Sequence, residues 1–167
     1  LTMSAGIDWD EQSHRLTDRR NDIVAAIYSD DWLQYVLDKR QIEPPGKRFN
    51  YSGGLNLLLG GIIQHSSDLY ADKFAEKYLF GPLGISDYRW HRHPDGTINT
   101  QGGLSLRPRD MAKIGYLFLR GGRWHGRQIV SQNWVSESTR PHIPAYFGLG
   151  YGYQWYRGQT TVNRKIF

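Results

Sequence analysis

A turn followed by a glycine- and leucine-rich helix, over residues 44–63, is the feature that most constrains this fold. Pro44, Pro45 and Gly46 predict the turn. A short extended segment then leads to Tyr51, and Ser52 is suited to cap a helix. We expect a buried, rigid helix with Tyr51 at its entrance, because the apolar residues that follow recur at helical spacing: Leu55, Leu58, Leu59, Ile62 and Ile63.

A tyrosine at such an entrance has two possible roles. As a catalytic base, Tyr51 has to lose its proton near neutral pH, whereas the ordinary pKa of a phenol is about 10. A neighbouring cation would have to lower that pKa. In the alternative role, Tyr51 is an aromatic side chain packed at a helix N-terminus with its hydroxyl hydrogen-bonded.

The residues around Tyr51 resemble one family. Pro-Gly-x-x-Phe-x-Tyr-Ser-x-Gly, followed by a leucine-rich helix, is similar to the tyrosine motif of the serine β-lactamase and penicillin-binding-protein superfamily. This group includes class C β-lactamases, D-Ala-D-Ala peptidases, esterases and 6-aminohexanoate-oligomer hydrolases. Three further blocks, residues 1–9, 102–115 and 121–155, resemble segments of the same family in the same order. Each block is weak alone, but their joint order is specific.

The resemblance implies an α+β fold of the αβα family type, of which this chain is mostly the helical region. We expect residues 1–167 to form a single partial domain. About 1–140 would be mainly helical, and about 141–167 would return to the family's sheet as an aromatic strand over residues 151–156. A strand of this kind has an unpaired edge, so self-association through it is an open possibility.

The family's chemistry uses Ser-x-x-Lys, in which a serine nucleophile and a lysine share one helix face. No serine of this chain has lysine three residues later, and the family's C-terminal His- or Lys-led motif is also missing. We therefore expect an internal part of a serine hydrolase that transfers acyl groups through a Ser-Lys-Tyr site, inactive by itself. The alternative is a non-catalytic binding protein that retains the fold.

The resemblance also suggests residues near the substrate, which would be a small ester, amide or lactam. Trp9 lies in a segment that borders the cleft in the family, although such a segment is more often a solvated acidic loop with one tucked aromatic. Gln101 and Gly102 precede a family helix and are either cleft neighbours or a plain hinge. Gly53 stands where the family often has an asparagine that binds a substrate amide, which favours an esterase, amidase or 6-aminohexanoate-oligomer hydrolase over a penicillinase.

Composition excludes several other functions. The formal charge of +5 is scattered and accompanies no nucleic-acid-binding signature, and no apolar run approaches the length of a membrane span. The absence of cysteine excludes disulfides and thiol chemistry. His91 and His93 would share one face of a strand but lack an acidic partner at ligand spacing, so we expect neither metal nor cofactor. Composition leaves the compartment open, and the resemblance implies a periplasmic or secreted location.

Overall fold

The computed structural model describes residues 1–158, 161–162 and 165–166. Within them the α-helices are α1 (Asp22–Ile27), α2 (Trp32–Leu37), α3 (Gly53–Ser67), α4 (Ala71–Ala75), α5 (Pro108–Leu119) and α6 (Gln132–Thr139). A π-helix over Glu76–Phe80 extends α4, and a 3₁₀ turn covers Tyr146–Gly148. The strands are β1 (Tyr88–Trp90), β2 (Leu104–Leu106), β3 (Arg123–Trp124), β4 (Arg127–Gln128), β5 (Ile143–Pro144), β6 (Gly150–Tyr151), β7 (Tyr156–Arg157), β8 (Thr161–Val162) and β9 (Lys165–Ile166).

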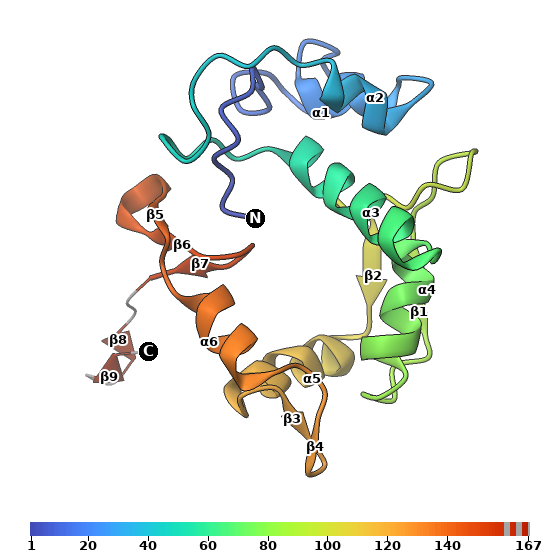
Figure 1. The fold of residues 1–167 in the computed structure, drawn as a ribbon, viewed down its shortest axis with the longest axis vertical. Helices are drawn as coiled ribbons and strands as arrows, with labels where there is room; N and C mark the ends of the chain where they lie inside the picture. The colour runs from blue at the N-terminus through green and yellow to red at the C-terminus, as the bar shows by residue number, and fades with distance from the viewer. Residues whose placement is uncertain (159–160, 163–164, 167) are drawn as a thin grey trace.

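The described strands pair into four small antiparallel sheets, β1-β2, β3-β4, β5-β6-β7 and β8-β9. Helices with small sheets confirm the expected α+β class. In Figure 1 the elements follow one another round a circuit, from α1 and α2 along α3 to α4, then through α5 and α6 to β5–β7. The circuit returns to its start, because the backbone amide of Gln154 donates to the carbonyl of Leu1 at 3.2 Å.

The described residues form three separate hydrophobic cores along this circuit. One joins the N-terminal loop, α1, α2 and α3, and contains Trp9, Ile23, Val24, Ala26, Trp32, Val36 and Leu57. A second gathers Phe80, Leu83, Ile85 and Leu117 beneath β1, β2 and α5. The third, beside Tyr51, contains Met3, Phe49 and Tyr151.

Helix α3 buries a different face from the one expected. Leu57 and Gly60 are buried, whereas Leu58 and Leu59 are only half-buried and Ile62 is 61% exposed. The reason is the helix's own glycines. Gly54 and Gly60 lie so close to Trp9, Val36 and Thr100 that a Cβ atom at either position would meet them below 3 Å. The neighbouring elements therefore pack on the glycine side of α3.

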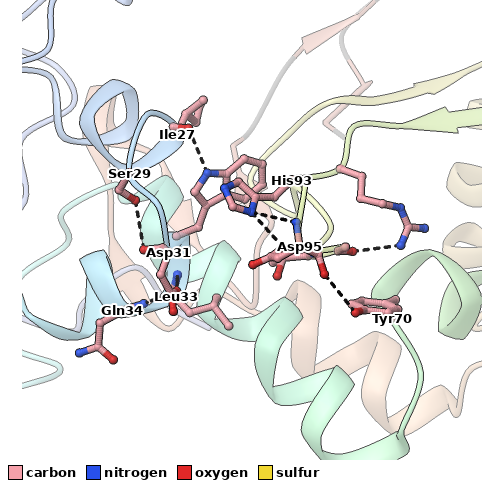
Figure 2. Close-up of polar contacts among 12 residues, drawn as sticks. Ile27, Ser29, Asp31, Leu33, Gln34, Tyr70, His93 and Asp95 are labelled. Atoms are coloured by element: carbon pink, nitrogen blue, oxygen red, sulfur yellow. Dashed lines mark hydrogen bonds and ion pairs between the residues drawn. The ribbon is translucent and has the colours of Figure 1, made fainter.

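Two strand predictions need correction. The aromatic segment 151–156 is an antiparallel hairpin in which Tyr151 of β6 lies opposite Tyr156 of β7, because the chain turns back at residues 152–155. Strand β1 ends at Trp90, so His91 and His93 lie beyond it. Figure 2 shows the loop that follows, in which His93 Nδ1 lies 2.9 Å from Asp95 Oδ1. The Tyr70 hydroxyl donates to the Asp95 carbonyl in the same loop.

The protein exposes 11102 Å² of surface. A compact monomer of this mass exposes roughly 8,500 Å², so the three cores leave more surface in solvent than one closed core would. Among the described residues, no helix has both the length and the apolar character that crossing a bilayer requires.

Candidate active site

Tyr51 is held at the entrance of α3 by the expected cap. The Ser52 hydroxyl accepts a hydrogen bond from the amide of Leu55 at 3.4 Å, and Ser52 itself is 1% exposed. On the preceding side, the amide of Asn50 donates to the carbonyl of Met3 at 2.7 Å. The backbone that carries Tyr51 is therefore fixed on both sides.

The Tyr51 side chain is half-buried and lines an open groove of about 570 Å³. The other residues that line the groove are Gln12, Tyr146, Phe147 and Tyr156. Tyr146 also touches the motif directly, since its hydroxyl accepts from the Tyr51 amide at 3.4 Å. Tyr51 is thus neither sealed inside a core nor isolated on the surface, and a small molecule can approach it along an aromatic wall.

A carboxylate connects two of the expected substrate neighbours. Glu11 Oε2 accepts one hydrogen bond from the Trp9 indole and another from the amide of Gly53, both at 2.7 Å. Trp9 is only 4% exposed and belongs to the first core, so its ring has almost no surface with which to meet a ligand. Trp9 is therefore linked to Gly53 only indirectly, because both residues donate a hydrogen bond to Glu11.

Gln101 and Gly102 have different surroundings. A Cβ atom at Gly53 would lie 3.3 Å from Gln101 Oε1, so Gln101 borders the start of α3 together with Glu11. The carbonyl of Gly102 instead accepts from the Trp90 indole at 3.1 Å. The structure brings Tyr51, Gly53, Trp9 and Gln101 together, and no contact of the described residues adds Gly102 to them.

The ionisation of the site favours a neutral phenol. Burial and, to a lesser extent, the negative charge of Glu11 raise the pKa of Tyr51 above its usual value. Burial also raises the pKa of Glu11, although the Gly53 amide and the Trp9 indole oppose that change. The described residues alone therefore move Tyr51 away from a base, and a cation would have to overcome both effects.

Glu11 and the aromatic wall are functional candidates that only the structure reveals. Glu11 lies in a loop with several acidic residues, and no pattern in the local sequence distinguishes it from Asp8 and Asp10. Tyr146, Phe147 and Tyr156 lie about 100 residues from Tyr51, and only the high aromatic content of their segment pointed to them.

A second groove, of about 530 Å³, lies between α5 and the β3-β4 hairpin. It is lined by cationic side chains, including Arg109, Arg120 and Arg123, and by none of the residues expected at the active site. Across the part of the chain that the structure describes, no three His, Cys, Asp or Glu side chains gather as a metal site would require. His93 faces Asp95 and the ring of Trp32, whose centroid is 4.8 Å away.

Comparisons with solved structures place this fold. The chain is similar to a candidate 6-aminohexanoate-dimer hydrolase from Bacillus anthracis, with a TM-score of 0.75 and 17% identity over 93% of this chain and 45% of that one. It is also similar to a penicillin binding protein from Bacillus halodurans, with a TM-score of 0.68 and 18% identity over 99% and 56% of the two chains. A D-amino acid amidase from Ochrobactrum anthropi gives a TM-score of 0.59 and 20% identity over 90% and 51%.

The chain thus spans about half the length of these proteins. No curated protein matches the sequence significantly. The family model described as Beta-lactamase matches residues 1–167, which is the whole chain and includes the Tyr51 motif and the three other blocks. The chain therefore belongs to the Beta-lactamase family.

Proposed function

We propose that this chain forms one wall of the active site of a serine hydrolase, with Tyr51 as its proton-transfer residue. The observation that carries the proposal is the half-buried phenol of Tyr51, fixed at the start of α3 and lining an open groove. The excess exposed surface supports it, because further protein would cover such a surface in a complete domain.

In this mechanism the nucleophile is the serine of a Ser-x-x-Lys motif supplied by protein outside residues 1–167. The lysine ammonium lowers the pKa of Tyr51, which then accepts the serine proton and later protonates the leaving group. Backbone amides stabilise the oxyanion of the tetrahedral intermediate. An acyl-serine forms as the leaving group departs, and water hydrolyses it in a second step.

The substrate we propose is a small ester or amide rather than a β-lactam. Gly53 has no side-chain amide to offer a lactam. The aromatic wall formed by Tyr146, Phe147 and Tyr156 suits an apolar group beside the scissile bond.

The test uses a fluorophosphonate probe and p-nitrophenyl acetate with the complete protein that contains this chain. The probe should label the Ser-x-x-Lys serine and should not label the 167-residue chain alone. Tyr51→Phe should lower kcat by about 10²- to 10⁴-fold, the usual contribution of acid-base catalysis. Tyr28→Phe is the matched control, because Tyr28 is 68% exposed and does not line the groove. Labelling of the 167-residue chain would contradict the proposed site.

One observation favours the second candidate, a non-catalytic binding protein. The surroundings of Tyr51 within this chain raise its pKa and so preserve its proton, as a binding site that uses the phenol as a hydrogen-bond donor would require. A complete protein that binds esters or amides in the groove but is never acylated would establish this role.

A further inference from the structure

Glu11 is the one acidic side chain of its loop that is tied to the start of α3. Its Oε2 atom accepts hydrogen bonds from the Trp9 indole and from the Gly53 amide, each at 2.7 Å. A carboxylate with two such donors has a fixed position rather than a choice of solvent-exposed rotamers. The contact joins parts of the chain 42 residues apart.

The backbone on both sides of Glu11 is also anchored. Asn21, which is 0% exposed, donates its side-chain amide to the carbonyl of Glu11 at 3.0 Å and to that of His14 at 2.8 Å. The side-chain amide of Asn50, next to Tyr51, donates to the carbonyl of Trp9 at 2.9 Å. The loop and the Tyr51 motif are therefore built as one unit.

The carboxylate of Glu11 accepts its hydrogen bond at the N-terminus of α3, where a negative charge is favourable. Gly53 is the first residue of α3, and the first amides of a helix have no partner inside it. A carboxylate there satisfies one of these amides and interacts favourably with the positive end of the helix dipole. Gly53 lies two residues after Tyr51, and the negative charge of Glu11 is the second cause, after burial, that raises the pKa of the phenol.

We propose that Glu11 is a positioning residue of the active site, which fixes the entrance of α3 and places a negative charge beside the phenol of Tyr51. The inference depends on the proposed function of Tyr51. A lysine near Tyr51 would draw the proton off the phenol, so that Tyr51 can accept the serine proton, and the negative charge of Glu11 opposes the lysine and so makes that phenolate a stronger base.

The other charged or titratable groups around this unit are Asp22, Lys39 and Tyr156. Asp22 of α1 raises the pKa of Glu11, but its own carboxylate is paired with Lys39. The Lys39 ammonium lies 5.8 Å from the centroid of the Trp9 ring. From β7, Tyr156 faces the same groove, and its pKa is raised by burial first and then by Tyr51, Tyr146 and Glu11.

The decisive variant is Glu11→Gln, which removes the charge and keeps an oxygen that can accept both hydrogen bonds. Glu76→Gln is the matched control, because Glu76 is an exposed glutamate of the π-helix that does not line the groove beside Tyr51. Glu11→Ala removes the acceptor as well. Hydrogen exchange at the Gly53 amide should stay slow in Glu11→Gln and become fast in Glu11→Ala.

The effect of the Glu11 charge is tested by following the pH titration of Tyr51 by NMR in the complete protein. The protein carries ¹³C-labelled tyrosine, and Tyr51→Phe assigns the signal of Tyr51. Glu11→Gln should titrate Tyr51 at lower pH than the wild type, and Glu76→Gln should leave it unchanged. In the pH profile of kcat/KM for p-nitrophenyl acetate, the limb that Tyr51 controls should move to lower pH in the same way.

Coincident Tyr51 titrations in Glu11→Gln and wild type would overturn the proposal, as would an unprotected Gly53 amide in the wild type. Failure of the proposed function looks different, because Tyr51→Phe would then keep its activity whatever Glu11 does. A role of Glu11 in stability alone predicts an unfolding change without any shift of the Tyr51 titration.

Discussion

Replacing Gly54 by alanine tests the packing that places Tyr51. A Cβ atom at Gly54 would lie 2.6 Å from Trp9 Cη2, 2.7 Å from Trp9 Cζ3 and 2.9 Å from Val36 Cγ2. Ordinary carbon contacts are about 3.5 to 4.0 Å. The indole of Trp9 cannot move away easily, because it is buried and its Nε1 atom donates a hydrogen bond to Glu11.

The magnitude follows from two opposing effects. Overpacking a core by a methyl group costs about 1 to 3 kcal/mol, and replacing glycine by alanine inside a helix returns about 1 kcal/mol. Gly54→Ala should therefore destabilise the protein by up to about 2 kcal/mol. Gly115→Ala is the matched control in α5, where a Cβ atom meets nothing within 4 Å, and it should stabilise by up to about 1 kcal/mol.

Urea unfolding of both variants in the complete protein gives the comparison, provided that the m-value stays constant. Both variants gain the same helix propensity from alanine, so this gain cancels when they are compared. The free energy of unfolding should therefore be about 1 to 3 kcal/mol higher for Gly115→Ala than for Gly54→Ala. If Gly54→Ala is as stable as Gly115→Ala, the close contact of Trp9 with α3 is wrong, and so is the account of how the Tyr51 motif is held.

Three further predictions concern the same region. Burial raises the pKa of Tyr151, so the stabilisation that this neutral phenol provides is complete below about pH 10 and is lost as the pH rises towards the folded-state pKa. Tyr151→Phe should therefore reduce the alkaline loss of stability by up to about 1.4 kcal/mol per pH unit. Urea unfolding between pH 9 and 12 measures this loss. Asn21→Ala removes the cap of α1 and leaves two carbonyls unpaired, and should cost about 3 kcal/mol in the same assay, whereas the exposed Asn133→Ala should change little. Gly53→Asn should raise nitrocefin hydrolysis relative to p-nitrophenyl acetate by about three- to tenfold through one added hydrogen bond; an unchanged ratio would argue against a lactam contact from position 53.

Local signals in the sequence were sufficient where one or two residues decide the structure. The start of α3 directly after Ser52 follows from the capping hydroxyl of that serine. The order of the motifs also predicted the family, which the match over the whole chain confirms.

The rest depended on partners distant in the sequence. Apolar spacing alone gave the wrong buried face for α3, because it cannot show that glycines let Trp9 and Thr100 approach the opposite side. The hairpin of β6 and β7 looks like one strand when only aromatic content is counted. The role of Glu11 depends on a contact with Gly53, and no local pattern distinguishes that glutamate from its solvated neighbours.

The division of the apolar interior into three cores has a consequence for sequence change. Among the residues that the structure describes, no side chain belongs to two of them, so substitutions in different cores should have additive effects on stability. The groove beside Tyr51 draws its wall from the third core and its surroundings. Selection for a different substrate could therefore reshape Tyr146 and its neighbours while the other two cores stay as they are.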